Sequence, residues 1–378
     1  MRMSLFSSLH RVLLIGTSVV VSFAVTAPQA GADTVAYVQT NLVSSNQADA
    51  SALLTDPNLI NPWGITSSAT SPFWVSDQGA ELSTLYAVTS ITNSINSLVV
   101  TIPAPSTPPS GPTGVVFNST TGFAIGSTAK AANFIFTTLA GTIVAWNSAS
   151  GAVVAATVPG AVFTGLAANG NNLYAADFKN NQIDVFNSSF VKTGSFTDPS
   201  VPAGYAPYNV HTINGMLYVE YAPVGTNGLP VLGSGNGIVD VFNANGTLVK
   251  TLINMNSNLN VPWGIALAPA GFGQFGGDLL VGNFGNGEIN AFDPVTGAYL
   301  GTLDNAQGNA LVNSGLWSLQ FGTAGNNGNP DTLYFTAGID DEAEGLFGEI
   351  NATPEPSTLA LFGGGLLSLI GSRRRKKA

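Results

Sequence analysis

The sequence NPWGI at residues 61–65 returns two hundred residues later as VPWGI at residues 261–265. Weaker copies follow the same pattern at GPTGV from residue 111, FTGL from 163, APYNV from 206 and GLWSL from 315. The matching positions are 63, 113, 164, 208, 263 and 317, which lie 44 to 55 residues apart. A period of this length is typical of repeat architectures, so the sequence predicts six similar units between residues 33 and 353.

Each unit has the pattern of strand, turn and strand. Residues 173–176 (LYAA) are apolar, residues 177–181 (DFKNN) form a polar turn, and residues 182–186 (QIDVF) alternate again. Such alternation around an Asn- or Gly-rich turn indicates a β-hairpin. Four strands in about fifty residues indicate a propeller blade. We therefore predict an all-β, six-bladed β-propeller, because a β-helix has much shorter repeats and a β-sandwich would not repeat six times.

The ends of the repeat region predict how the ring closes. The last unit has three expected strands, near residues 315–321, 332–337 and 346–350, and it lacks a fourth. A spare strand at residues 35–43 (VAYVQTNLV) precedes the first unit. We expect this N-terminal strand to complete the last blade, which closes the ring and removes its exposed edges. The proline-rich residues 101–114 are expected to form an extended connection between the first two blades.

Two terminal segments are expected to direct export instead of forming the fold. Residues 1–32 combine basic residues, an apolar run at 12–27 and a small-residue site, AGA, at 30–32, which predicts a cleaved signal peptide. Residues 354–378 begin with Pro354, Glu355 and Pro356, continue with 13 apolar residues at 359–371 and end with RRRKK. That run reaches about 20 Å, short of the ~30 Å membrane core. The basic cluster is expected to stay cytoplasmic, so the tail predicts a transient inner-membrane association.

The three-part tail resembles the PEP-CTERM sorting signal of Gram-negative bacteria that make extracellular polysaccharide. The resemblance implies removal of the tail by an exosortase, after signal peptidase has cut the N-terminus. It further implies that the body reaches the cell surface or the extracellular matrix, where polysaccharide is a possible partner.

Charge and composition exclude several classes of function. Between residues 33 and 353 there are four lysines, no arginine and twenty acidic residues, a formal charge of −16. This acidic body lacks the basic face that nucleic-acid binding requires, and it offers no arginine clamp for phosphate. The chain contains no cysteine, which excludes disulfides and thiolate catalysis.

Two further resemblances concern the body. The hairpin at residues 177–186 is similar to the NHL repeat, with Gln182 where that family usually has arginine, so the nucleic-acid role of some NHL proteins does not carry over. Nearly the whole mature chain resembles an uncharacterised family of secreted six-bladed propellers that often carry the same sorting tail. The resemblance rests on NLINPWGI at 58–65, LLVGNF at 279–284 and FTAGIDDEAEGLFG at 335–348.

Few residues are candidates for chemistry. His211 is the only histidine beyond the signal peptide, which rules out a histidine cluster for zinc, and a Ser-His-Asp triad would require it. We expect a histidine near the channel wall, with a catalytic base as the alternative. Asn61, Asn209 and Asn260 are further candidates for the end of the channel. Trp63, Trp263 and Trp317 occupy matching positions, which predicts packing between blades, and a platform for sugar stacking is the alternative.

Acidic and amide side chains gather in the turns. Asp77, Asp177 and Asn283 end second strands, where such residues cap turns. The alternative is a ring of oxygen ligands around a central calcium, as in lactonase-type propellers. Four carboxylates cluster in the last blade, at Asp340, Asp341, Glu342 and Glu344. They predict either a solvated loop or a modest calcium site, since calcium prefers oxygen ligands.

The sequence thus favours a non-catalytic surface protein that acts by binding or scaffolding. A calcium-dependent, lactonase-type hydrolase and a carbohydrate-binding module are the alternatives.

Overall fold

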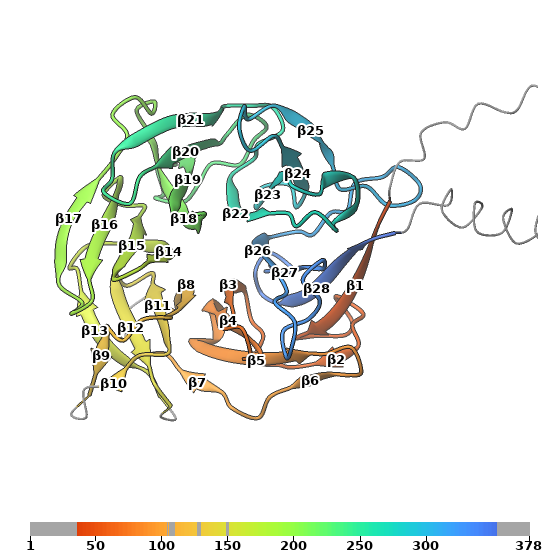
Figure 1. The fold of residues 1–378 in the computed structure, drawn as a ribbon, viewed down its shortest axis with the longest axis horizontal. Helices are drawn as coiled ribbons and strands as arrows, with labels where there is room; N and C mark the ends of the chain where they lie inside the picture. The colour runs from red at the N-terminus through yellow and green to blue at the C-terminus, as the bar shows by residue number, and fades with distance from the viewer. Residues whose placement is uncertain (1–35, 104, 106–109, 127–129, 149–150, 354–378) are drawn as a thin grey trace, which may run out of the picture. The chain divides into compact units, whose positions relative to one another are not determined.

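The computed structural model describes residues 36–103, 105, 110–126, 130–148 and 151–353. Six antiparallel sheets surround a central axis, and the chain passes through them in order around the ring (Figure 1). The prediction of an all-β, six-bladed propeller is confirmed. The described residues contain no α-helix, only two 3₁₀ turns, η1 (Gln78–Ala80) and η2 (Gly273–Phe275). The expected signal peptide, the Pro354-Glu355-Pro356 motif and the rest of the tail lie outside the described residues. Within the described ranges, no helix is long and apolar enough to cross a membrane.

Each blade begins with an inner strand that contains one of the predicted repeat positions. In order from blade 1 to blade 6 these strands are β3 (Pro62–Thr66), β8 (Pro112–Phe117), β14 (Phe163–Asn169), β18 (Tyr205–Ile213), β22 (Pro262–Leu267) and β26 (Leu316–Phe321). The glycine of the repeat is required by the close approach of neighbouring inner strands. A Cβ at Gly64 would lie 2.5 Å from the carbonyl oxygen of Thr113, and one at Gly264 would lie 2.4 Å from that of Trp317. These distances are far below van der Waals contact, so only glycine fits.

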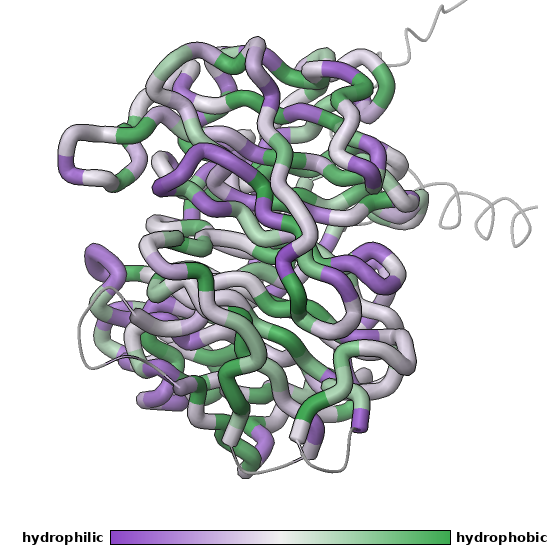
Figure 2. Tube along the Cα trace, turned by 90° about the vertical axis from the view of Figure 1, so that its left-hand side faces the viewer, coloured by the Kyte–Doolittle hydropathy of each residue, from purple (hydrophilic) through white to green (hydrophobic). Residues whose placement is uncertain are grey.

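The second and third strands of each blade pair as an antiparallel hairpin, and the connection between them is longest in blade 4. The second strands are β4 (Phe73–Asp77), β11 (Phe134–Thr138), β15 (Asn172–Asp177), β19 (Met216–Pro223), β23 (Leu279–Asn283) and β27 (Leu333–Ala337). The third strands are β5 (Leu82–Val88), β12 (Thr142–Trp146), β16 (Gln182–Asn187), β20 (Ile238–Phe242), β24 (Ile289–Phe292) and β28 (Leu346–Ala352). Apolar side chains on these strands pack between adjacent blades and form the core. Apolar and polar positions follow one another at short intervals along the trace, as strand alternation requires (Figure 2).

The outer strands are more exposed than the inner ones. They are β6 (Asn93–Ile95) with β7 (Val100–Thr101), β13 (Val153–Thr157), β17 (Lys192–Phe196), β21 (Leu248–Asn254), β25 (Tyr299–Thr302) and β1 (Tyr37–Ser44) with β2 (Leu54–Thr55). A small additional hairpin, β9 (Ala124–Ile125) and β10 (Lys130–Ala131), follows the inner strand of blade 2. Part of the proline-rich connection at residues 101–114 lies outside the described residues, and the part described leads from β7 to β8.

Strand β1 closes the ring as predicted. It runs antiparallel to β28, with Tyr37 opposite Ala352 and Ser44 opposite Leu346, so the chain's first strand is the outer strand of blade 6 (Figure 1). Tyr37 is fully buried, and its hydroxyl donates to the carbonyl oxygen of Phe272 at 3.1 Å. Its ring stacks on Phe275 with 5.9 Å between centroids. Since Phe272 and Phe275 belong to blade 5, the closing strand also ties blade 6 to its neighbour.

Candidate functional site

A cavity of about 750 Å³ opens at the end of the channel where the inner strands begin. The turns between the second and third strands of all six blades contribute to its wall. Its lining is mainly apolar and includes five aromatic side chains, Trp63, Phe178, Tyr208, Phe284 and Trp317. A concave apolar site with a few polar groups is the usual form of a small-ligand site. We therefore take this aromatic cavity as the candidate functional site.

The floor of the aromatic cavity is an aromatic cluster on the central axis. Trp63 and Trp317 stack with 3.7 Å between ring centroids. Trp263 meets both rings edge-on, at 6.0 Å and 5.6 Å, and Phe284 lies 4.3 Å from Trp317. The three tryptophans come from blades 1, 5 and 6. These blades are consecutive around the ring, so the tryptophans pack against one another between blades.

The three indole N–H groups of this cluster differ in their partners. Trp263 donates to the carbonyl oxygen of Thr164 at 3.0 Å, and Trp317 donates to Oδ1 of Asn61 at 2.9 Å. Nε1 of Trp63 is buried and finds no acceptor in the described part of the chain. An unpaired buried donor costs free energy. The floor of the aromatic cavity therefore contains one hydrogen-bond donor, the indole N–H of Trp63, that the described residues leave unpaired.

Asn61 connects this floor to the acidic loop of blade 6. Its Nδ2 donates to Oε1 of Gln78 at 2.9 Å and to Oε2 of Glu342 at 2.7 Å. Burial raises the pKa of Glu342, the bond from Asn61 lowers it, and the charge of Asp341 raises it again. Sequence analysis listed Asn61 and Glu342 separately, and the structure brings them together at the wall of the aromatic cavity.

The other candidates for the channel lie elsewhere. A second, smaller cavity of about 340 Å³ is lined by the later residues of the inner strands, among them Asn209 and His211. Nε2 of His211 lies 3.0 Å from the carbonyl oxygen of Trp263, which also accepts a bond from Nδ2 of Asn209 at 2.7 Å. Desolvation lowers the pKa of His211 to about 4, so its imidazole is neutral at physiological pH. Asn260 serves a loop, since its Oδ1 accepts the backbone N–H of Gly233 at 2.7 Å.

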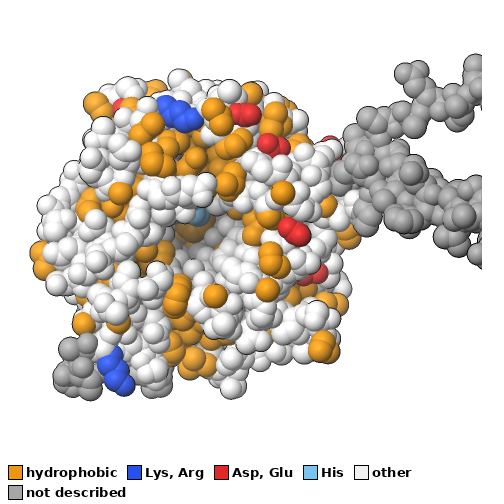
Figure 3. All heavy atoms as spheres, viewed as in Figure 1, with side chains coloured by type: hydrophobic (Ala, Val, Ile, Leu, Met, Phe, Trp, Pro, Cys, Tyr) orange, Lys and Arg blue, Asp and Glu red, His pale blue; other side chains and the backbone are white. Residues whose placement is uncertain are grey.

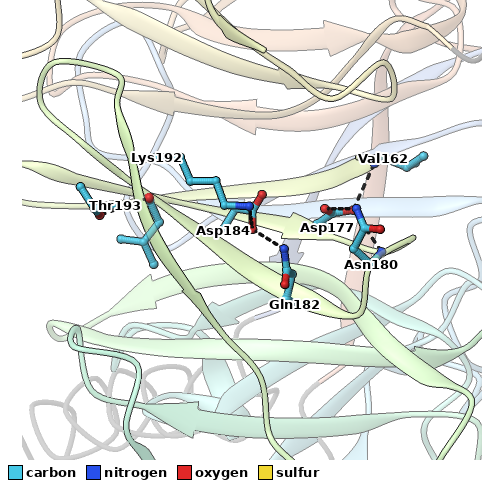
Figure 4. Close-up of polar contacts among 8 residues, drawn as sticks. Val162, Asp177, Asn180, Gln182, Asp184, Lys192 and Thr193 are labelled. Atoms are coloured by element: carbon cyan, nitrogen blue, oxygen red, sulfur yellow. Dashed lines mark hydrogen bonds and ion pairs between the residues drawn. The ribbon is translucent and has the colours of Figure 1, made fainter. Parts of the chain in front are cut away.

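The acidic and amide residues that end the second strands accept hydrogen bonds from backbone N–H groups, and Asp177 caps its own turn in this way. Oδ1 of Asp177 accepts the backbone N–H groups of Asn180 at 3.3 Å and Val162 at 3.2 Å, as Figure 4 shows. Oδ2 of Asp77 accepts the backbone N–H of Thr84 at 2.8 Å, and Oδ1 of Asn283 accepts that of Asn260 at 2.9 Å. Only the bond between Asp177 and Asn180 lies within one turn. The others join residues 7 to 23 positions apart and attach these strand ends to neighbouring segments.

The same hairpin of blade 3 carries an ion pair. Nζ of Lys192 lies 2.7 Å from Oδ1 of the buried Asp184, which also accepts from Nε2 of Gln182 at 2.8 Å (Figure 4). Gln182 therefore supports an internal charge on its own blade. The similarity of this hairpin to the NHL repeat stays a prediction.

The four acidic residues of the blade 6 loop do not converge on one point. Asp340 and Asp341 are exposed, Glu342 bonds Asn61, and Oε2 of Glu344 accepts the hydroxyl of Ser45 at 2.5 Å. Among the described residues, no group of three or more His, Cys, Asp or Glu side chains is placed to hold a metal ion. Calcium binding by this loop stays a prediction from the sequence.

Sequence analysis missed the aromatic residues that complete the floor of the aromatic cavity. Phe178 and Phe284 each follow the residue that ends a second strand, and Tyr208 occupies the repeat position of blade 4. An aromatic residue just after a capped strand end was the signal available. The face seen in Figure 3 has a central hollow, and charged side chains are sparse on it.

The comparisons with known proteins concern the tail and the body separately. Residues 352–376 match the model of the PEP-CTERM protein-sorting motif, which indicates export and exosortase-type processing. Two solved structures are similar to this chain at low identity. A chain of the nidogen/laminin complex has 13% identity and a TM-score of 0.42, covering 71% of this chain and 82% of that one. Hydrazine synthase of Kuenenia stuttgartiensis has 12% identity and a TM-score of 0.32, covering 75% of this chain and 58% of that one.

The body has relatives at higher identity in Acanthamoeba polyphaga mimivirus. Uncharacterized protein R648 is 34% identical over 329 residues, which cover 82% of this chain and 79% of the relative. Uncharacterized protein L690 is 33% identical over 315 residues, which cover 78% of this chain and 81% of the relative. The chain therefore belongs to the protein family that includes R648 and L690 of the mimivirus.

Proposed function

We propose that this exported propeller binds a saccharide segment of extracellular polysaccharide in the aromatic cavity, without chemical reaction, at the cell surface or in the matrix. The observation that carries the proposal is the set of five aromatic side chains that line one cavity of about 750 Å³. Aromatic rings offer flat apolar surface, and those of tryptophan and tyrosine add a polar group at one edge. A pyranose ring has the complementary surface, with apolar C–H faces and hydroxyl groups around them.

The rigidity of the site supports a binding role. Trp263 and Trp317 are held by hydrogen bonds to Thr164 and Asn61, and the capped turns form the wall. A preorganised site loses little conformational entropy when a ligand enters. The exosortase-type tail supports the location, because the motif indicates a body carried out of the cytoplasm.

A titration of the mature exported protein with neutral β-1,4-linked glucose oligosaccharides tests the proposal. We expect a saturable change in tryptophan fluorescence, because Trp63 and Trp317 line the aromatic cavity. Replacing the half-buried Phe284 by alanine should weaken binding about tenfold, a change typical of losing one aromatic contact. Tyr299→Ala is the matched control, since Tyr299 is exposed on the outer strand β25. Absence of binding by glucose, N-acetylglucosamine and glucosamine oligosaccharides alike would refute the proposal.

Calcium binding by the acidic loop is a separate proposal. Its support is the density of carboxylates at residues 340–344, two of which already bond to the protein through Asn61 and Ser45. A bound ion stabilises the folded state by mass action. Thermal unfolding in millimolar calcium, compared with unfolding in chelator, tests it: a higher Tm with calcium that Glu344→Gln reduces supports the site, and identical curves exclude it.

A further inference from the structure

We infer that the aromatic cavity is selective for saccharides that carry a free amino group, with the ammonium held between the carboxylates of the blade 6 loop and the aromatic rings. This inference rests on the proposed function and specifies its ligand. Three independent features support it: the charge at the rim of the aromatic cavity, the rings of its floor and the unpaired indole of Trp63.

The charge at the rim favours a cation. Asp341 and Glu342 both line the aromatic cavity, where burial raises the pKa of Glu342 most and the nearby charge of Asp341 raises it further. Asn61 holds one carboxylate oxygen of Glu342 and so fixes the direction of the group. Lys179 lines the same cavity but is exposed, so two carboxylates oppose one flexible ammonium group. A bound cation relieves the repulsion between the two acids, whereas a uronic acid or a sulfated sugar would increase it.

The rings of the floor favour the same charge. An ammonium group within about 6 Å of an aromatic face is attracted by the negative face of the ring, and the attraction grows where water is excluded. Trp63, Tyr208 and Trp317 line the aromatic cavity as a connected cluster, with centroid distances of 3.7 Å, 6.2 Å and 6.4 Å, and their exposed fractions are 6%, 3% and 1%. The carboxylate of Glu342 lies close enough to Tyr208 for its charge to act on the phenol. A ligand ammonium between these groups gains both attractions at once.

The indole N–H of Trp63 favours a ligand that also carries a hydrogen-bond acceptor, which a simple cation lacks. Trp63 is 6% exposed, lines the aromatic cavity and has no acceptor for its Nε1–H among the described residues. A ligand that supplies an oxygen to this donor removes an unpaired buried group. An amino sugar provides both parts, an ammonium for the acids and rings and a hydroxyl or ring oxygen for the indole.

Three series of β-1,4-linked oligosaccharides of equal length isolate the charge. They differ only at carbon 2, which carries an amino group in glucosamine oligomers, an acetamido group in N-acetylglucosamine oligomers and a hydroxyl in glucose oligomers. We expect the mature protein at pH 6 and low salt to bind the glucosamine series at least about tenfold more tightly than the other two. The advantage should shrink as salt is added, because salt screens charges near the surface.

Two isosteric substitutions in one loop separate local from general charge. Glu342→Gln should abolish the preference for the amine, so that the glucosamine series binds no more tightly than the two neutral series. Glu344→Gln is the matched control, because its carboxylate accepts from Ser45, it does not line the aromatic cavity, and the change in net charge is the same. Trp63→Phe keeps the ring and removes the N–H, so it should weaken all three series by a similar factor. Thermal melts of each variant confirm that the fold is retained.

The outcomes distinguish the inference from the function beneath it. Equal binding of all three series overturns the selectivity and leaves saccharide binding standing. A preference that Glu344→Gln removes as fully as Glu342→Gln assigns it to net charge and also overturns the inference. Failure of every series to bind refutes the proposed function itself.

Discussion

Buried ionisable residues give this protein its pH dependence. Desolvation lowers the pKa of His211 to about 4 and raises that of Asp240 to about 7, where Thr251 lowers it and the neighbouring Asp198 raises it. In the unfolded chain histidine titrates near 6.5 and aspartate near 3.9. Both groups are therefore neutral in the folded protein over a pH range in which the unfolded chain would charge them.

The two residues act in opposite directions as pH changes. Below pH 6.5 the unfolded chain takes up a proton at His211 that the folded protein does not, so stability falls as pH drops toward 4. Above pH 3.9 the folded protein keeps a proton on Asp240 that the unfolded chain releases. The free energy of unfolding therefore falls as pH rises from about 3.9 to about 7. Each effect amounts to at most about 1.4 kcal/mol per pH unit.

We predict that His211→Gln flattens the loss of stability between pH 6.5 and 4, and that Asp240→Asn raises the free energy of unfolding above pH 7. Chemical denaturation at a series of pH values measures both slopes. Asp304→Asn, at a half-buried position on the connection that follows β25, serves as the control for a general change of charge. Slopes identical to that of the parent in both variants would contradict the assignment.

Predictability at the residue level depends on how local an interaction is. Asp177 caps its own turn, three residues away, so sequence spacing was sufficient to expect this bond. The Asn61 bond to Glu342 spans 281 residues, and the stack of Trp63 on Trp317 joins the first and last blades. Repeat alignment placed each tryptophan on an inner strand, but it contained no information on which rings would meet.

A strand is easier to predict from the sequence when its side chains or backbone pack closely against neighbouring strands. The starts of the inner strands could be predicted to within a few residues, because they carry the repeated motif. The motif includes the glycines at 64 and 264, where a neighbouring backbone leaves no room for a side chain. The two-residue strands β2, β9 and β10 were not predicted. They lie at edges, where pairing depends on the nearby chain and few side chains are buried, so no alternation marks them.

Strand β1 provides the sharpest test at this level. We predict that a mature chain that begins at Ser45, and so lacks β1, loses its cooperative unfolding transition. Blade 6 then lacks the ladder from Tyr37 to Ser44, and the edge of β28 is exposed. Tyr37→Ala alone should cost about 3–5 kcal/mol, as other buried aromatic truncations do. Calorimetry of both proteins measures the effect.

The control for this truncation begins at Ala36, which removes no residue of the strand. It should unfold at the temperature of the parent. An unchanged melting curve for the chain that starts after Ser44 would show that β1 does not hold the ring closed.

The molecule as a whole combines an acidic body with a rigid ring. Its formal charge of −16 between residues 33 and 353 favours solubility and repels anionic polymers, except where a site provides compensating contacts. The propeller concentrates the start of every inner strand at one end of the channel, so six short segments far apart in sequence form one surface. Sequence analysis predicted the ring and its closure, but not the cavity. A cavity depends on which side chains leave space, which requires their positions in three dimensions.

Sorting of the whole molecule depends on the C-terminal motif that the family model matches at residues 352–376. We predict that replacing Pro354, Glu355 and Pro356 by alanine leaves export intact and blocks removal of the tail. The predicted signal peptide at residues 1–32 and the apolar run at 359–371 are unchanged in this variant, so we expect it to lose only recognition by the processing enzyme. The unprocessed body should then stay with the inner-membrane fraction, through an apolar segment of 13 residues and its basic end. Mass spectrometry of the exported protein and cell fractionation measure the two effects, and Thr353→Ala, which leaves Pro354, Glu355 and Pro356 in place, is the matched control. Equal mature mass and equal surface display in the triple variant would show that the tail is processed by another route.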